Sequence, residues 1–114
     1  MDAGVNLLFT SSWYNHTVIP AQEGRGAAEP TVLYGPLCMN IDVIRESVPL
    51  PPMSVGDRIV IKNVGAYNVT QWMQFIMLRP AIVMVGTDGR VARIRRAETV
   101  SDIASLEGVP DWLR

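Results

Sequence analysis

The sequence is poor in the groups that most metal sites and nucleophilic enzymes need. Its 114 residues include one cysteine, Cys38, one histidine, His16, and one lysine, Lys62. A single cysteine cannot form a disulfide within the chain, so a reducing compartment, the cytoplasm, is the expected location. A lone cysteine and a lone histidine do not supply the clustered ligands of a zinc site. His16 is therefore predicted to lie on the surface or on a strand face.

Long apolar runs, a large net charge and a phosphate-binding glycine loop are missing as well. The formal net charge is −1, which gives no field to attract nucleic acid or an anionic membrane. No apolar run reaches the roughly 20 residues of a membrane helix. The only basic cluster lies in residues 90–96, and on a strand its arginines divide between two faces, which favours a solvated hairpin over a nucleic-acid surface. We expect neither a membrane nor a nucleic-acid partner.

What the chain does contain predicts a mostly β fold in one domain, residues 1–114. Short runs of strand-forming residues alternate with turns, and Asp88-Gly89 is a strong hairpin signal. Thr99 to Asp102 form a capping box that begins a short helix. Residues 71–78 are apolar with no clear period. Together these features predict a Greek-key-like β barrel or sandwich with one short C-terminal helix. The expected strands are 12–19, 31–34, 41–48 (stopped by Pro49), 58–62, 81–85 and 90–96.

The stretch from Gly35 to Asp42 is the most informative. Gly35 is able to adopt a positive φ and Pro36 fixes its own φ, so the pair predicts a rigid turn that delivers Cys38 to a fixed place. A small buried core residue is the alternative interpretation of Cys38. Trp72 and Phe75 belong to an apolar segment too large for the core of one small domain, which indicates an interface.

Several ordered motifs resemble one family. They are Gly35-Pro36-Leu37-Cys38 with Asp42, Val55-Gly56-Asp57, Gly65-Ala66-Tyr67, Arg79-Pro80 and Arg95-Arg96-Ala97-Glu98-Thr99. In this order the chain resembles the C-terminal β domain of the fold-type III pyridoxal-phosphate decarboxylases, the diaminopimelate, ornithine and arginine decarboxylase group, a domain like that of alanine racemase. The opening residues 2–6 resemble the segment that leaves the barrel of those enzymes, so we expect a piece of a longer protein.

The resemblance implies an amino-acid decarboxylase that uses pyridoxal phosphate and acts as a homodimer. The Schiff-base lysine would lie in an N-terminal α/β barrel outside this chain, so the chain alone is expected to be inactive. Cys38 matches a catalytic cysteine supplied across the dimer interface, and Tyr67 matches a tyrosine beside the cofactor. Tyr14 matches a substrate-binding tyrosine. Asp42 is expected at the dimer contact together with Trp72 and Phe75.

Two departures from the family pattern concern the substrate. Thr10 stands where diaminopimelate enzymes have an arginine for the distal carboxylate. Met39, the second substrate-binding candidate, stands where a carboxylate pairs with a distal ammonium. The resemblance therefore implies an altered amino-acid substrate.

Two other interpretations remain open. Besides a decarboxylase domain, the chain could be a catalytically silent homologue that serves as a dimerisation or regulatory module, or an unrelated small barrel that binds a ligand or partner. The sequence upstream would decide between them, because a barrel with a Schiff-base lysine would establish the decarboxylase interpretation.

Overall fold

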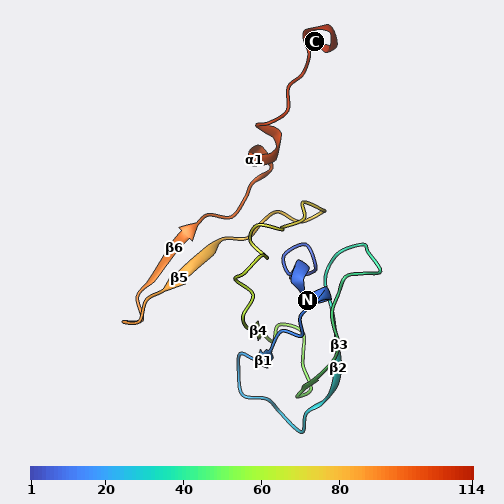
Figure 1. Cartoon of the computed structure of the whole chain (residues 1–114), viewed down its shortest axis with the longest axis vertical. Coiled ribbons are helices and arrows are strands. Elements are labelled where there is room, and N and C mark those ends of the chain that lie inside the picture. Colours follow the sequence, from blue (N-terminus) through green and yellow to red (C-terminus); the bar gives the residue numbers. More distant parts are fainter. The chain divides into compact units, whose positions relative to one another are not determined.

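A computed structural model describes all 114 residues, which divide into two compact units, Met1–Phe75 and Ile76–Arg114 (Figure 1). No helix has the length and apolar character needed to cross a membrane. The elements of the first unit are η1 (Phe9–Ser12), β1 (Val18–Pro20), β2 (Glu29–Tyr34), β3 (Val43–Leu50) and β4 (Ile59–Ile61). Those of the second are β5 (Ile82–Val85), β6 (Val91–Arg95), α1 (Val100–Ala104) and η2 (Asp111–Leu113).

The strands pair as three two-stranded antiparallel sheets. β1 pairs with β4, β2 with β3, and β5 with β6. The prediction of a mostly β chain with one short α-helix is confirmed. The three ladders do not close into a barrel, so the barrel or Greek-key part of the prediction is not confirmed.

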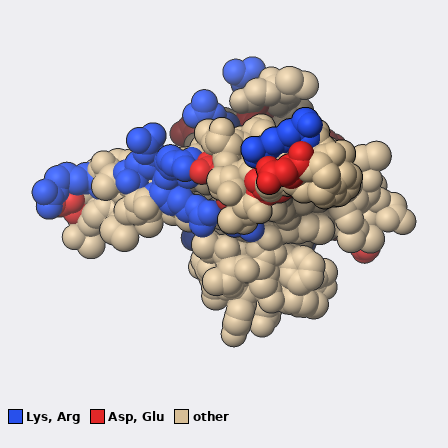
Figure 2. Space-filling model, turned by 90° about the horizontal axis from the view of Figure 1, so that it is seen from above, with Lys and Arg blue, Asp and Glu red and all other residues tan.

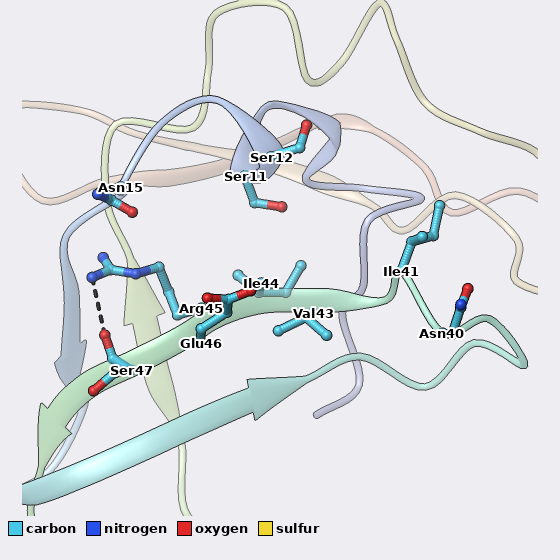
Figure 3. Close-up of a pocket in the computed structure, with 10 residues that line it drawn as sticks. All are labelled: Ser11, Ser12, Asn15, Asn40, Ile41, Val43, Ile44, Arg45, Glu46 and Ser47. Carbon is cyan, nitrogen blue, oxygen red and sulfur yellow. Dashed lines mark hydrogen bonds between the residues drawn. The ribbon is translucent and has the colours of Figure 1, made fainter.

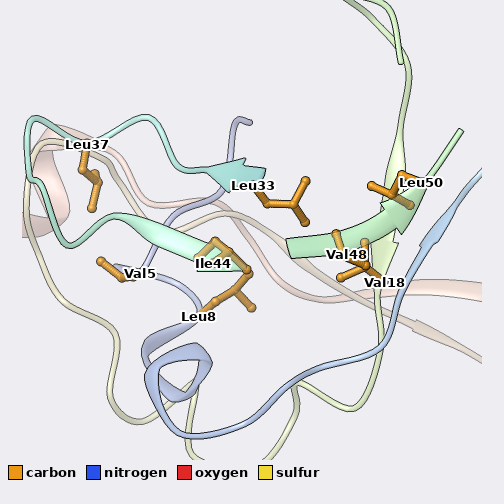
Figure 4. Close-up of a cluster of buried hydrophobic side chains, with 8 residues drawn as sticks. All are labelled: Val5, Leu8, Val18, Leu33, Leu37, Ile44, Val48 and Leu50. Carbon is orange, nitrogen blue, oxygen red and sulfur yellow. The ribbon is translucent and has the colours of Figure 1, made fainter. Parts of the chain in front are cut away.

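The hydrophobic core lies in the first unit. Its eight buried side chains come from the N-terminal segment, from β1 to β3 and from the loop after β2; they are Val5, Leu8, Val18, Leu33, Leu37, Ile44, Val48 and Leu50 (Figure 4). Full burial of such a side chain contributes about 1.5–3 kcal/mol. Because these residues come from distant parts of the sequence, the core ties the N-terminal segment to the β2–β3 hairpin.

The predicted strand over residues 12–19 is largely wrong. Residues 9–12 form η1, and only Val18 and Ile19 of the predicted range belong to a strand. The backbone carbonyl of Thr10 accepts hydrogen bonds from the N–H groups of Trp13 and Tyr14, both at 2.9 Å. Thr10 is itself buried and hydrogen-bonded. This buried turn overrides the strand propensity of the two aromatic residues.

Proline does not stop β3 where the sequence predicts. β3 continues through Pro49, which faces Pro30 of β2, and ends at the buried Leu50. Residues that face each other in an antiparallel ladder exchange either two N–H···O bonds or none. Two prolines have no N–H to exchange, so they share a position where none is needed.

The β2–β3 ladder changes register twice. Thr31 faces Val48, Leu33 faces Arg45 and Tyr34 faces Val43. From Thr31 to Tyr34 there are three steps along β2, whereas from Val48 to Val43 there are five along β3. β3 therefore carries two extra residues, which increase the local twist just before the loop that joins the strands.

The carboxylate of Asp42 fixes that loop. Its side chain is 2% exposed, Oδ1 accepts the N–H of Val5 at 2.7 Å, and Oδ2 accepts the N–H of Leu37 at 2.7 Å. A Cβ on Gly4 or Gly35 would overlap this carboxylate. The φ of Gly35 is not positive, so the predicted reason for this glycine is wrong. Gly35 is needed because the carboxylate approaches its backbone too closely for any side chain.

The second unit follows its sequence signals closely. The predicted hairpin is observed, and Gly89 has a positive φ of 80° in its turn. α1 begins after Thr99, whose N–H donates to Asp102 at 2.8 Å, as the capping box predicts. Glu98 pairs with Arg79 and Arg95, each at 3.4 Å. Basic groups gather along β6 and its turn, where Figure 2 shows several blue side chains and few red ones.

Removal of the Asp42 carboxylate should lower the free energy of unfolding of the first unit. Asp42→Ala leaves two buried N–H groups without an acceptor, and hydrogen bonds to a charged group contribute about 1.5–3 kcal/mol each. We expect a loss of about 2–4 kcal/mol in the free energy of unfolding, measured by urea titration of core methyl signals. Asp57→Ala is the control, because that exposed carboxylate accepts one hydrogen bond, from Ser54 N–H. Equal losses in both variants would contradict the anchoring role.

Acid should weaken α1 through Asp102. Hydrogen bonds from the Arg96 guanidinium, and then from the N–H and hydroxyl of Thr99, hold the pKa of Asp102 well below its ordinary value of 3.8. A lowered pKa means that the stabilisation is present above pH 3.8 and is lost as the pH falls through the folded-state pKa. A carboxyl chemical-shift titration should show Asp102 ionised well below pH 3.8.

Arg96→Gln should raise the pKa of Asp102 toward 3.8, because it removes the largest cause of the shift. Arg114→Gln, which breaks the exposed contact with Asp111, should leave it unchanged. If the native chain titrated Asp102 at its ordinary pKa, the assignment would be wrong.

Candidate functional site

The loop between β2 and β3 presents Cys38 to solvent. The thiol residue is exposed, so its interpretation as a buried core residue is wrong. Hydrogen bonds from Met39 N–H to the Leu37 carbonyl (2.8 Å) and from Asp42 N–H to the Met39 carbonyl (3.1 Å) close the loop. Met39 is half-buried and packs against the core. The loop thus turns one neighbour inward and holds the thiol outward on a fixed backbone.

Two tyrosines are also exposed on constrained segments. Tyr14 follows η1 and is 55% exposed, with its ring centroid 6.2 Å from that of His16. Tyr67 lies in the turn after Gly65 and is 62% exposed, with a φ of 66°. A positive φ is uncommon for a residue with a side chain.

The other predicted site residues differ in their surroundings. Asp42 is buried and bonded to its own chain, as described above. Trp72 is half-buried, whereas Phe75 is exposed. Residues 71–78, whose period is ambiguous in the sequence, form neither helix nor strand. The predicted interface role of these residues stays a prediction.

The first unit brings the predicted residues together only in part. Cys38, Met39 and Asp42 share one loop. No hydrogen bond or ring contact joins Cys38, Tyr14 and Tyr67 to one another. Each of these three side chains is exposed and has unoccupied contact surface. The arrangement presents reactive and polar groups outward and does not enclose a reaction site.

A buried polar network, which sequence reasoning missed, contains His16, whose ring lies near that of Tyr14, and Asn68, which follows Tyr67. Thr10, His16 and Asn68 are 1%, 8% and 2% exposed. The Thr10 hydroxyl donates to Asn68 Oδ1 at 2.9 Å and lies 2.8 Å from His16 Nε2. The prediction that His16 lies on the surface or on a strand face is therefore wrong. The side chains meet because η1 brings Thr10 to the turn that holds Asn68, and no local motif announces a contact between residues so far apart.

A polar pocket of about 600 Å³ lies elsewhere in the first unit (Figure 3). Ser11 and Asn15 line it from one side, and Arg45 and Glu46 of β3 line it from the other. Arg45 is already engaged, because its guanidinium donates to the carbonyls of His16 (2.9 Å) and Ser47 (3.2 Å). None of the exposed candidates Tyr14, Cys38 and Tyr67 lines this pocket. The pocket is therefore separate from the predicted chemistry.

The side chains of this chain suit a hydrogen bond to pyridoxal phosphate better than covalent attachment of this cofactor. Lys62 is exposed at the end of β4, and a lysine that forms a Schiff base is normally desolvated. The described chain holds no group of three or more His, Cys, Asp or Glu residues that could bind a metal. Tyr67, by contrast, has an exposed hydroxyl that can donate to a phosphate oxygen. Contact between Tyr67 and pyridoxal phosphate stays a prediction, as does the absence of a Schiff base on Lys62.

Comparison with known proteins identifies relatives along the whole chain. It is 33% identical to the diaminopimelate decarboxylase of Archaeoglobus fulgidus over 99% of this chain, and 37% identical to that of Streptomyces coelicolor over 96%. Among solved structures, diaminopimelate decarboxylase from M. jannaschii superposes on 99% of the chain with a TM-score of 0.86 and 30% identity. The chain covers only 28% of each of the two curated relatives and 26% of the solved one.

The family match itself covers more than half of the sequence. Residues 1–65 match the family described as the C-terminal sheet domain of pyridoxal-dependent decarboxylases. This range contains the Asp42 anchor and the Cys38 loop, and it ends at the first residue of the Tyr67 motif. The chain belongs to the family of pyridoxal-dependent decarboxylase C-terminal sheet domains.

Proposed function

We propose that this chain is the C-terminal part of a pyridoxal-phosphate-dependent amino-acid decarboxylase and supplies side chains to an active site that other parts complete. The observation that carries the proposal is the exposure of Cys38 and Tyr67 on backbone segments fixed by buried hydrogen bonds, within a chain of this family. The missing parts are an N-terminal barrel of the same protein and a second subunit. In the complete protein the three ladders would belong to a barrel or sandwich.

The chemistry open to this chain is proton transfer and orientation. Pyridoxal phosphate, when bound, supplies the electron sink that decarboxylation of an amino acid requires. The Cys38 Sγ–H is able to donate a proton to the substrate carbon that has lost its carboxylate. The Tyr67 hydroxyl donates a hydrogen bond to a phosphate oxygen, and Tyr14 orients the substrate through its exposed ring and hydroxyl.

Association with a second subunit would bury the apolar surface that the chain exposes. Phe75 is exposed and Trp72 is half-buried, and interfaces are enriched in such aromatic residues. Asp42 has no exposed carboxylate to offer a partner. Its contribution to the interface is therefore indirect, through the loop that it fixes.

We also propose that the substrate differs from diaminopimelate. At the two positions where the family resemblance leads us to expect charged groups that grip the far end of a substrate, this chain has Thr10 and Met39. Thr10 is buried within the polar network, and Met39 packs against the core. Neither offers a charge to a substrate carboxylate or ammonium. A neutral or larger distal group is compatible with the adaptable methionine side chain.

The first test compares this chain with the full-length protein. The chain alone, incubated with stoichiometric pyridoxal phosphate and borohydride, should leave Lys62 unlabelled. The full-length protein should release CO₂ from an amino acid and lose most of this activity in Cys38→Ala, whereas Cys38→Ser keeps a weak proton donor. A full-length protein that lacks a reactive barrel lysine and binds no pyridoxal phosphate would instead support a silent dimerisation module.

The second test concerns specificity. Met39→Glu in the full-length protein should raise the turnover of a diamino acid by about tenfold or more, since an unpaired buried ammonium costs several kcal/mol. Turnover of the natural substrate should fall. Met39→Gln is the matched control, because it changes polarity without adding charge, and it should leave diamino-acid turnover low. Native enzyme that already turns over diaminopimelate at an ordinary rate, on the order of 10 per second, would disprove the altered specificity.

A further inference from the structure

Each end of the buried network of Thr10, His16 and Asn68 lies beside one exposed tyrosine. We infer that this network is a positioning device that fixes Tyr14 and Tyr67 relative to each other. The role of the two tyrosines in catalysis rests on the proposed function. The positioning itself rests only on the geometry of the first unit.

Tyr67 needs such a device because its backbone is strained. Its φ of 66° is uncommon for a residue with a Cβ and persists only where the surroundings impose it. The Tyr67 carbonyl accepts the N–H groups of Thr70 (3.1 Å) and Gln71 (2.9 Å) and the Thr70 hydroxyl (2.9 Å). These bonds hold the C-terminal side of the turn.

Asn68 holds the other side. Its side-chain Nδ2 donates to the Val64 carbonyl at 2.8 Å, and its backbone N–H donates to the Ala66 carbonyl at 2.9 Å. The side chain is 2% exposed, whereas its neighbour Tyr67 is 62% exposed. With the Asn68 amide held in the interior, the preceding residue, Tyr67, faces solvent.

The orientation of the Asn68 amide follows from its backbone partners. The Thr10 N–H, which can only donate, lies 3.1 Å from Oδ1. The Val64 carbonyl, which can only accept, receives Nδ2. An exchanged amide would place donor against donor and acceptor against acceptor. Oδ1 therefore accepts both the N–H and the hydroxyl of Thr10.

The same counting assigns a proton to His16. Thr10 has one hydroxyl proton, and Asn68 Oδ1 accepts it. The contact of 2.8 Å between Thr10 Oγ1 and His16 Nε2 then requires Nε2 to donate. His16 is fixed at its backbone as well, because its carbonyl accepts Arg45. The Tyr14 ring lies beside this fixed imidazole, at 6.2 Å between centroids.

The test removes the central hydroxyl and follows the tyrosines in this chain by NMR. Thr10→Val should weaken the strong intraresidue HN–Hα nuclear Overhauser effect of Tyr67 that a positive φ produces, and should shift the ring signals of Tyr14. Thr10→Ser, which keeps the hydroxyl, should retain both signals. Thr17→Val is the matched control, because Thr17 is exposed and its side chain forms no hydrogen bond. A folded Thr10→Val chain with unchanged tyrosine signals would overturn the inference.

A measurement on the unmodified chain covers the case in which Thr10→Val does not fold. The imidazole ¹⁵N shifts should show a protonated Nε2 on His16. A neutral ring that carries its proton on Nδ1 instead would overturn the network as described.

Kinetics of the full-length protein separate this inference from the proposed function. If the proposed function holds, Thr10→Val should lower kcat by about ten- to a hundredfold, the size expected for misplaced catalytic groups, and Thr10→Ser should restore it. Loosened tyrosines in a full-length protein with no decarboxylase activity would support the positioning and refute the proposed function. An active full-length Thr10→Val variant with native kcat would refute the positioning role.

Discussion

The structure of the first unit depends on one buried carboxylate. Asp42 ties the N-terminal segment to the loop after β2, because its carboxylate accepts the N–H groups of Val5 and Leu37 and its backbone carbonyl accepts the N–H of Gly35. A buried charge is costly unless it is hydrogen-bonded on all sides. The surrounding glycines allow the backbone to come close enough to provide those bonds. The hydrogen bonds that the buried Asp42 carboxylate requires therefore fix the loop that carries the Cys38 thiol.

Local signals in the sequence predict the second unit well. The Asp88-Gly89 turn and the Thr99 capping box each depend on residues within four positions of one another, and both appear as expected. Local chemistry also predicts a turn at Gly35-Pro36, but it gives the wrong reason for Gly35 and does not decide whether the Cys38 thiol is exposed.

Contacts between distant segments account for the failures. Trp13 and Tyr14 favour a strand by propensity, but the buried Thr10 carbonyl holds them in a turn. The sequence around His16 contains no motif that predicts its contact with Thr10. That contact belongs to a buried network that also includes Asn68, from the other end of the first unit. The exposed positions of Tyr14 and Tyr67 follow from this network. The family resemblance assigns site roles to Tyr14 and Tyr67, which stay predictions, and it gives no account of what holds the two side chains.

The doubled register change in the β2–β3 ladder has a consequence for how this sequence tolerates insertions and deletions. β3 gains two residues on β2 within a few positions, and its buried side chains Ile44 and Val48 lie four residues apart, an even number that matches a shared face. Deletion of one residue between them would make this separation odd. On one side of the deletion, the side chains of β3 that face the core would then face solvent. A single-codon deletion there would remove only one residue but would misplace the loop that carries the Cys38 thiol.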